Sequence, residues 1–341
     1  MGVAIGALLV KKEIELSSLS GKVLTVDAPM WLYQFLSSIR QPDGTPLMDS
    51  KNNITSHLMG LSTRVPNLME KGIKLAFCFD GKVPDLKQKE RDRRNGLKLE
   101  AEALYEEAAK KQDIAGMKKY AQRSNRLTSN MITEAKELLE AFGIPVINSP
   151  SEGEAQASHI VKKGEAYAVA SNDADVLMFG APKLIKNLNI VGKKKKASQI
   201  AYEVVKPELV ELSENLKYLG IDNDKLIAMS MLVGTDYNIG GIKGIGPKGA
   251  LSLVKKHDAV DAIFKEARWS EHFTTPWQDI FNLIKTMPIT DDYELKWKPI
   301  DKEKIMRILV DNHDFAEERV QSALEKLGSE KEQKGLADFF K

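Results

Sequence analysis

The sequence predicts an α/β protein in which helices flank a mainly parallel central sheet. Short apolar runs that end in aspartate recur in "KVLTVD" (22–27), "IKLAFCFD" (73–80) and "GEAYAVASND" (164–173). Helix-forming stretches separate these runs or follow them, at residues 28–40, 54–72 and 128–143. Strands that alternate with helices form βαβ units, and such units give parallel sheets.

Further elements follow along the chain. The "FGIP" at 142–145 is typical of a helix end that leads into another strand, "PVINS". The runs 184–191 and 199–205 are predicted to form a hairpin whose turn, "GKKKKAS", carries four solvated lysines. From Asp222 to about residue 328 we expect mostly helix, followed by a polar tail.

Composition limits the class of protein. The chain has 341 residues, of which 43% are hydrophobic, enough for one elaborated α/β domain or two intimate lobes. No apolar run approaches the roughly 20 residues of a membrane span, and the opening "MGVAIGALLVKK" does not have the charge order of a signal peptide. Cys78 is the only cysteine, expected as a buried strand thiol, so an intracellular, cytoplasmic protein is predicted.

Charge is unevenly distributed. The net charge is only +2, but residues 86–126 hold 12 Lys and Arg against 7 Asp and Glu, which leaves the remainder at about −3. The segment has helix-forming composition and few large apolar residues, so we expect it to stand out from the body. A basic segment beside an acidic remainder is consistent with a polyanion held near a metal site, or with a solvated, salt-bridged helical pair.

Carboxylates gather where the predicted strands end. In an open parallel sheet, ligands bind outside the carboxyl ends of the strands. Asp27, Asp80 and Asp173 fall at such ends, and Asp175 follows at the next turn. The remaining candidates are Glu152 and Glu154, which open the helix after "NSP", and Asp236 in "LVGTDYN".

Each acid also has an ordinary structural explanation. Ser151 and Glu154 fit a capping box, Asp173 or Asp175 could cap a helix, and Asp27 could be a turn residue. Seven acids converging on one edge, however, would be destabilising without cations. Oxygen-only ligands select Mg²⁺ or Mn²⁺, and two such ions can activate water and stabilise the leaving oxygen of a phosphodiester.

A glycine-rich stretch supplies a second signal. In "GGIKGIGPKGALSLVKK" (240–256), Gly244 and Gly246 make a tight turn and Pro247 suits the first helical position. Free amides at the helix start favour a phosphate, and Lys243 and Lys248 add charge. This helix–hairpin–helix pattern grips a DNA backbone without reading bases; the alternative is a glycine-rich helix connection.

The chain resembles the flap endonucleases, the structure-specific 5′ nucleases of the XPG/Rad2 family, in their archaeal form. The matching blocks run in family order over nearly the whole chain: "VDAPMWLYQFL", "TSHLMG", "FDGKVPDLKQKERDRR", "PSEGEAQA", "SNDADVLMFGAP" and "VGTDYNIGGIKGIGPKGAL". The resemblance implies a PIN-like 5′ nuclease fold with a helical arch and a helix–hairpin–helix (H2TH) element. It also implies two Mg²⁺ ions, replaceable by Mn²⁺, and a K⁺ ion at the hairpin turn.

The resemblance assigns roles to particular residues. The seven acids named above become the metal ligands. Lys87 and Arg94 match basic residues at the base of the arch that touch the scissile phosphate, and Tyr33 matches an aromatic position on which a base stacks. Without the resemblance, Tyr33 would be taken for a core tyrosine. The amino terminus is expected near the site.

The end of the chain has the spacing of a sliding-clamp-binding box. In "QKGLADFF", Gln333, Leu336, Phe339 and Phe340 would place three apolar side chains on one side of a helical turn. Exposed paired aromatics are costly unless a partner covers them. We expect the clamp (PCNA) to bind here; the alternative is a terminal helix that folds back on the body.

These observations predict a monomeric 5′ flap endonuclease that also has 5′–3′ exonuclease activity. We expect it to act on branched DNA in Okazaki fragment maturation and base excision repair. It is expected to associate with the nucleoid and not with membranes. The expected regions are nuclease (1–98), arch or cap (99–127), nuclease with helix–hairpin–helix (128–258), C-terminal helices (259–328) and clamp-binding tail (329–341). The rival interpretations are a small-molecule metal phosphatase and a non-catalytic, clamp-bound DNA-binding scaffold.

Overall fold

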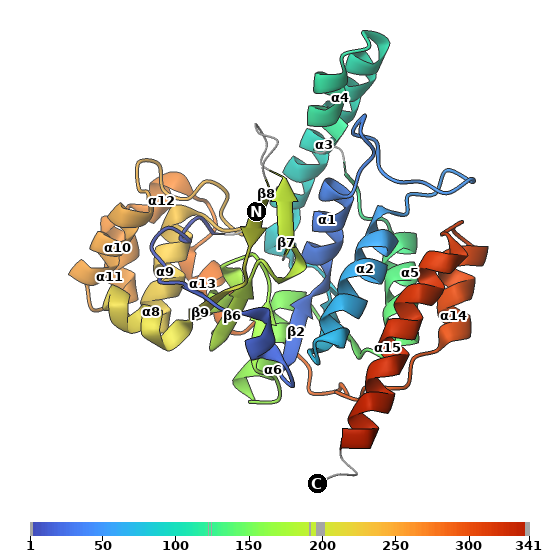
Figure 1. Ribbon diagram of the computed structural model, residues 1–341. Coiled ribbons are helices and arrows are strands. Elements are labelled where there is room, and N and C mark those ends of the chain that lie inside the picture. Colours follow the sequence, from blue (N-terminus) through green and yellow to red (C-terminus); the bar gives the residue numbers. More distant parts are fainter. Residues whose placement is uncertain (1–2, 122, 124, 191, 196–201, 338–341) are drawn as a thin grey trace.

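A seven-stranded sheet organises the fold in the computed structural model, which describes residues 3–121, 123, 125–190, 192–195 and 202–337 (Figure 1). Its strand order is β1-β9-β6-β5-β2-β3-β4. The strands are β1 (Lys12–Glu13), β2 (Val23–Asp27), β3 (Lys74–Phe79), β4 (Val146–Asn148), β5 (Ala168–Ala170), β6 (Lys183–Lys186) and β9 (Glu208–Glu211). From β4 to β6 neighbouring strands are parallel, and only β9 and β1 are antiparallel. The predicted fold class is confirmed.

Helices cover both faces of the sheet. They are α1 (Ala28–Ser38), α2 (Ser56–Glu70), α3 (Gln88–Lys110), α4 (Ile114–Ala121), α5 (Ser129–Ala141), α6 (Gly153–Lys162), α7 (Asp175–Met178), α8 (Leu212–Leu219), α9 (Asn223–Val233), α10 (Pro247–Lys256), α11 (Val260–Glu266), α12 (Trp269–His272), α13 (Trp277–Lys285), α14 (Lys302–Met306) and α15 (Glu317–Ala337). A π-helical turn, Arg307–Asp311, follows α14. Short 3-10 turns span Leu16–Leu19, Asp85–Lys87 and Leu188–Ile190.

Two cores lie on opposite faces of the sheet, as the alternation along β3 shows. Leu75, Phe77 and Phe79 pack with α1, α2, α5 and α15, whereas Ala76 and Cys78 pack with α6, α7 and α9. Successive side chains of a strand point to opposite faces, so β3 contributes side chains to both cores. The expected buried Cys78 thiol is confirmed, and burial raises its pKa.

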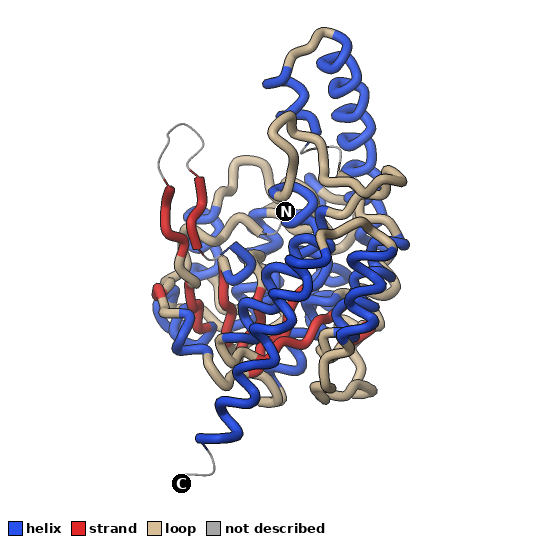
Figure 2. The backbone as a smooth tube through the Cα atoms, turned by 45° about the vertical axis from the view of Figure 1, so that its right-hand side comes forward, coloured by secondary structure: helices blue, strands red, loops and turns tan. Residues whose placement is uncertain are grey.

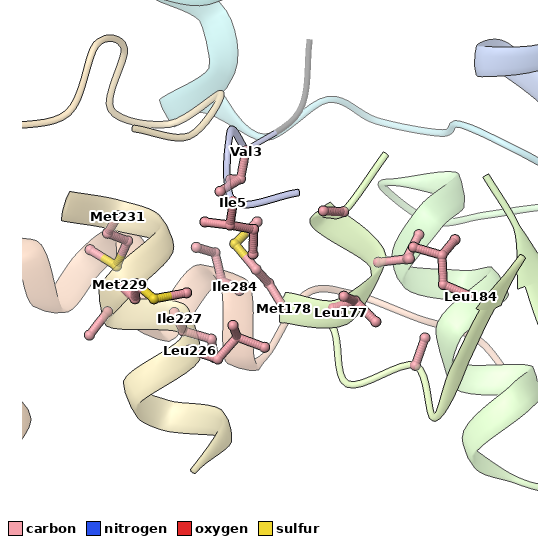
Figure 3. Packing of buried hydrophobic residues seen from close by; sticks show 14 of the residues in the cluster. Val3, Ile5, Leu177, Met178, Leu184, Leu226, Ile227, Met229, Met231 and Ile284 are labelled. Atoms are coloured by element: carbon pink, nitrogen blue, oxygen red, sulfur yellow. The ribbon is translucent and has the colours of Figure 1, made fainter. Parts of the chain in front are cut away.

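The first residues of the described chain are part of the core. Val3 and Ile5 are buried, with 5% and 0% of their surfaces exposed. Figure 3 shows them between the short helix α7, which carries Met178, and helix α9. This packing brings the start of the chain to the helix that begins at Asp175.

The basic segment protrudes as expected. Helices α3 and α4 form a hairpin that stands away from the body, as both backbone views show (Figures 1 and 2). Of the 23 residues of α3, only Glu90, Ala101 and Ala108 are buried. No helix in the described parts of the chain is long and apolar enough to cross a membrane.

The predicted hairpin of 184–191 with 199–205 was wrong in its first strand. Residues 184–186 belong to β6 of the main sheet, and the small separate hairpin pairs β7 (Gly192–Lys195) with β8 (Tyr202–Val205). Asn187 ends β6 because its φ is 64° and its backbone N–H donates to Asn172 Oδ1 at 2.6 Å. Lysines 193–195 therefore lie in a strand and not in a turn, and residues 196–201 lie outside the described part.

Candidate active site

Three neighbouring strands bring their terminal aspartates to one edge of the sheet. Strand β2 lies between β3 and β5, and all three are parallel. Asp27 is the last residue of β2, Asp80 directly follows β3, and Asp173 lies three residues beyond β5. The strands that follow β2 in the sequence lie on both sides of it, with β3 and β4 on one side and β5 and β6 on the other. Open α/β sheets bind ligands at the carboxyl ends of the strands where the strand order reverses in this way.

Asp27 and Glu154 face the same hydroxyl group. Ser171 Oγ lies 3.4 Å from Asp27 Oδ2 and 3.4 Å from Glu154 Oε1. Asp27 Oδ1 also accepts a hydrogen bond from Met30 N at 3.2 Å and so caps helix α1. The Asp27 carboxylate therefore caps a helix and is also a member of the acidic cluster.

Asp80 is held by the first turn of α6. Its Oδ1 accepts a hydrogen bond of 2.7 Å from the Gly153 backbone N–H. A Cβ at position 153 would lie 3.0 Å from that same oxygen and 3.0 Å from the Cys78 carbonyl oxygen. Glycine thus permits the close approach of α6 to Asp80, whose charge acts on Glu152.

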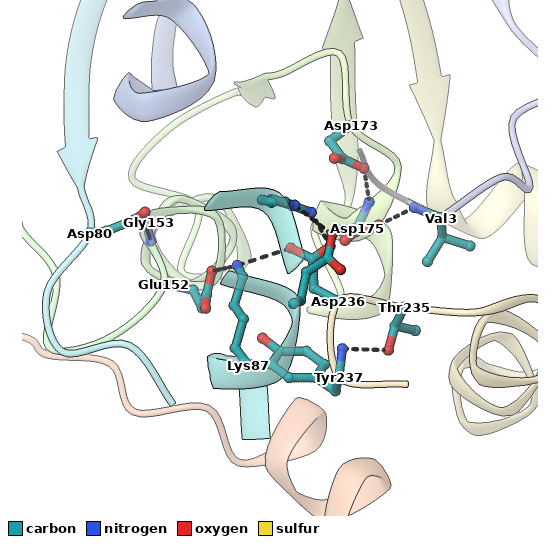
Figure 4. A network of polar contacts seen from close by, with 12 residues as sticks. Val3, Asp80, Lys87, Glu152, Gly153, Asp173, Asp175, Thr235, Asp236 and Tyr237 are labelled. Carbon is teal, nitrogen blue, oxygen red and sulfur yellow. Dashed lines mark hydrogen bonds and ion pairs between the residues drawn. The ribbon is translucent and has the colours of Figure 1, made fainter. Parts of the chain in front are cut away.

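Asp173 and Asp175 form a second pair. The backbone N–H of Asp175 donates to Asp173 Oδ1 at 3.1 Å, and the N–H of Val3 donates to Asp175 Oδ1 at 2.7 Å (Figure 4). The amino-terminal segment therefore touches the cluster directly, although residues 1–2 lie outside the described chain. Only 8% of the surface of Asp175 is exposed.

Two cations from the base of the arch reach the same cluster. Lys87 Nζ lies 2.7 Å from Glu152 Oε2 and 3.2 Å from Asp236 Oδ2. Arg94 donates to the other oxygen of Asp236 and, through Nε, to Glu90 Oε1 at 2.5 Å. Figure 4 shows Lys87 between Glu152 and Asp236. The seven predicted acids and both predicted basic residues thus interact in one cluster, some through hydrogen bonds or ion pairs and the others through their charges.

The pKa values show how strongly the acids interact. Burial and the neighbouring Asp80 charge raise the pKa of Asp27 to about 7. Burial, together with Asp173, raises the pKa of Glu154 and of Asp175 well above the usual range. For Lys87, burial acts to lower the pKa, but the charges of Glu152 and Asp236 outweigh it and raise the value. Ionised together, these acids repel one another unless cations offset the charge.

Helix capping accounts for only part of the acids at positions 152–175. Helix α6 has Glu152 as its N-cap residue and α7 has Ala174, and neither of these residues caps its helix with its own side chain. The first amide of α6 bonds to Asp80 instead, and that of α7 bonds to Asp173. The capping box of Ser151 and Glu154 is therefore absent from the described structure. Two of the capping interpretations correspond to observed contacts: Asp27 caps α1, and Asp173 accepts from the first amide of α7.

The donor set suits hard divalent ions, but the side chains are not arranged around one. The cluster offers carboxylate oxygens, which are the ligands of Mg²⁺ and Mn²⁺. Among the residues that the structure describes, no three His, Cys, Asp or Glu side chains lie close enough together to hold an ion as they stand. Lys87 and Arg94 instead contact Glu152 and Asp236. Metal binding would therefore require these carboxylates to rotate.

Tyr33 is an exposed residue of α1 and not a core tyrosine. Its side chain keeps 39% of its surface exposed. Lys98 of the arch helix α3 places Nζ 3.4 Å from the Tyr33 hydroxyl and 5.0 Å from the ring centroid. An accessible ring beside the arch helix is compatible with base stacking.

The glycine hairpin connects α9 to α10 as expected. Gly244 has a φ of 87°, a conformation that favours glycine, and Gly246 is the N-cap residue of α10, which Pro247 begins. No side chain of the described residues caps this helix start, so its amides point to solvent or a ligand. The same connection carries Asp236 into the acidic cluster.

The predicted clamp-binding residues are only partly covered. Gln333 and Leu336 lie in the last turns of α15, and Phe339 and Phe340 lie outside the described residues. The four-residue prediction thus remains untested.

Sequence reasoning missed several members of the network. The hydroxyl of Ser171, the backbone N–H of Val3 and the carboxylate of Glu90 all contact predicted site residues. Tyr237 lies beside Lys87 in Figure 4, and burial with the charge of Glu152 raises its pKa well above the usual value. Position next to Asp236 was the one signal that could have singled out Tyr237.

Comparisons with known proteins agree with this geometry. Residues 4–101 match the family model of the XPG N-terminal domain, and residues 143–236 match that of the XPG I-region. The chain is 53% identical to "Flap endonuclease 1" of Thermococcus onnurineus over 96% of this chain and 94% of that protein. The corresponding protein of Pyrococcus abyssi is 52% identical over the same shares.

Solved structures point the same way. The flap endonuclease-1 from Methanococcus jannaschii has a TM-score of 0.75 and 40% identity, covering 96% of this chain and 98% of its own. The catalytic core of Rad2 in complex with DNA substrate has a TM-score of 0.67 at 23% identity, covering 95% and 97% respectively. At that identity the second likeness shows a shared fold.

Proposed function

This chain belongs to the flap endonuclease family of XPG-type nucleases, and we propose that its acidic sheet edge is the centre at which it hydrolyses phosphodiester bonds in 5′-flap DNA. The enzyme is a structure-specific nuclease that acts on flaps. Cleavage falls near the junction of single strand and duplex and leaves a 5′-phosphate and a 3′-hydroxyl, as in lagging-strand maturation and base excision repair.

The observation that carries the proposal is the cluster of seven carboxylates and two arch cations. Buried acids with raised pKa values are costly in a fold that does not use them. Divalent ions held there, Mg²⁺ with Mn²⁺ as a substitute, would supply an activated water and stabilise the leaving oxygen. The ligands are Asp27, Asp80, Glu152, Glu154, Asp173, Asp175 and Asp236.

The remaining residues position the DNA. Lys87 and Arg94 form ion pairs with Asp236 in this structure. In the substrate complex they would contact the scissile phosphate instead and offset the charge that develops in the transition state. Tyr33 offers a ring for the base beside the scissile bond. The protruding hairpin of α3 and α4 takes the 5′ single strand, and it presents the basic side chains of the segment from Leu86 to Arg126.

Other contacts complete the substrate complex. The turn before α10, with Lys243, Gly244, Gly246 and Lys248, holds the backbone of the downstream duplex through its amides and ammonium groups. A K⁺ ion at that turn belongs to the same proposal. The enzyme works as a monomer, and the tail residues Gln333, Leu336, Phe339 and Phe340 bind the sliding clamp.

An Asp175→Asn variant tests the centre. Removing one carboxylate from the cluster leaves the DNA-binding surfaces intact, so single-turnover cleavage of a 5′-flap substrate in Mg²⁺ is expected to fall by about 10³-fold or more while flap binding survives. Unchanged cleavage would show that Asp175 is not part of the catalytic centre, and flap binding by the wild type without any cleavage would favour the scaffold interpretation. Wild-type turnover of a generic phosphate ester, but not of flap DNA, would favour the small-molecule phosphatase.

A further inference from the structure

Glu90 is a buried carboxylate on a helix that is otherwise largely exposed. It lies in the first turn of α3, and only 4% of its surface is exposed. Glutamate is almost never fully buried unless it is paired. No metal-ligand role falls to Glu90, because it is not among the seven acids at the sheet edge.

Its two partners are neighbouring arginines of the same helix. Arg93 donates from Nε to Glu90 Oε2 and from Nη2 to Oε1, both at 2.7 Å. Arg94 donates from Nε to Oε1 at 2.5 Å. The hydrogen bonds from Arg93, and then those from Arg94, hold the pKa of Glu90 at about 2 although burial opposes them. The carboxylate is thus charged at neutral pH.

Arg94 is consequently held at two points. Its Nε edge is fixed to Glu90, and its Nη2 donates to Asp236 at the sheet edge. Lys87 takes the second oxygen of Asp236 at 3.2 Å. A ligand that engages Asp236 would displace the Nη2 contact but leave the Glu90 contact in place, because the two contacts use different nitrogen atoms of the guanidinium.

We propose that Glu90 is a positioning residue, which holds the Arg94 guanidinium over the acidic cluster so that its outer edge can receive the scissile phosphate. This inference rests on the proposed function of Arg94. The long arginine side chain has many rotamers, and Glu at i with Arg at i+4 is the favourable order for pairing on a helix. Burial of Glu90 keeps water from competing for that pair.

Single-turnover cleavage of a 5′-flap substrate tests the proposal. Arg94→Ala is expected to slow cleavage by about 10²- to 10³-fold, as loss of a charge-stabilising donor does. Glu90→Gln keeps the shape and loses the charge, and is expected to slow cleavage by about 10- to 100-fold with flap binding almost unchanged. Glu90→Asp keeps the charge one methylene further back and is expected to recover part of the rate.

The double variant separates positioning from a general structural effect. If Glu90 acts through Arg94, adding Glu90→Gln to Arg94→Ala costs less than about threefold more, because effects of residues that act as a unit are not additive. Multiplicative losses would overturn the inference. So would Arg93→Ala reproducing the whole loss of Glu90→Gln, since the carboxylate would then act through the other arginine.

Two controls keep the outcomes distinct. Glu107 forms an exposed i,i+4 pair with Lys111 on the same helix at 2.6 Å, and Glu107→Ala is expected to leave the rate within about twofold. Circular dichroism shows whether Glu90→Gln folds. If it does not fold, the cleavage rates of Glu90→Asp and Arg93→Ala are used in its place to test the role of Glu90. If Arg94→Ala cleaves at the wild-type rate, the proposed role of Arg94 is wrong. If Arg94→Ala cleaves slowly but Glu90→Gln cleaves at the wild-type rate, only the proposed role of Glu90 is wrong.

Discussion

Replacing Asp27 with asparagine is expected to stabilise the fold in the absence of divalent ions. Only 4% of Asp27 is exposed, and burial with the Asp80 charge raises its pKa from 3.8 to about 7. These two pKa values differ by about three units, and each unit corresponds to about 1.4 kcal/mol. Keeping the Asp27 carboxylate ionised therefore lowers the free energy of unfolding by at most about 4 kcal/mol. Asparagine has the same shape and caps a helix as well as aspartate does, so the cap on Met30 survives.

The pH dependence follows from the sign of the shift. Because the pKa of Asp27 is raised in the folded protein, its penalty is absent below about pH 4, grows between about pH 4 and 7, and is complete above 7. The stability gained by Asp27→Asn should follow the same course. Urea unfolding in chelator at pH 5 and pH 8 measures it. Mg²⁺ should then stabilise the wild type, by about 2.7 kcal/mol at 100 times the dissociation constant, and the variant much less.

An exposed aspartate provides the matched control. Asp222 caps α9 through a 2.8 Å hydrogen bond from the Lys225 N–H and lies on the surface. Asp222→Asn is expected to change the free energy of unfolding by no more than about 0.5 kcal/mol at either pH. The reasoning is refuted if Asp27→Asn is less stable than the wild type at pH 8 in chelator, or if the gain is the same at pH 5.

Two predictions concern the arch and the tail. Lys87→Ala should slow single-turnover cleavage by about 10²- to 10³-fold while flap affinity changes little. The control is Lys71→Ala, at an exposed lysine that follows α2 and has no role in the proposed site; a parallel loss of rate and affinity would contradict the assignment. Deleting residues 333–341 should abolish stimulation by the sliding clamp and spare basal cleavage, because the deletion removes none of the residues assigned to the acidic edge. Equal stimulation of both forms would count against it.

The sequence predicted the sheet and the acids because both depend on local pattern. Asp27, Asp80 and Asp173 end apolar strand runs, and parallel strands bring such ends together whatever the distance along the chain. The same logic could not supply β1 and β9, whose antiparallel pairing closes the edge of the sheet. The two residues of β1 are too few to show the alternation of apolar and polar residues that predicts a strand, so only their pairing with β9 identifies them as one.

The supporting contacts were not predictable for a different reason. Val3 reaches Asp175 across 172 positions, and Ser171 reaches Glu154 across 17. An amide and a hydroxyl carry no signal in a single sequence, since every residue has the former and serine is common in turns. Glu90 was counted among the charges of a solvated helix, because burial of one face depends on how α3 docks on the body.

The account depends on the acidic edge binding divalent cations. A crystal soaked in Mn²⁺, with anomalous difference maps, measures this directly. We predict two peaks about 4 Å apart, surrounded by oxygens of Asp80, Glu154, Asp175 and their neighbours, with Lys87 and Arg94 withdrawn from Asp236. Maps without a peak at these carboxylates, at Mn²⁺ concentrations that support cleavage, would contradict it.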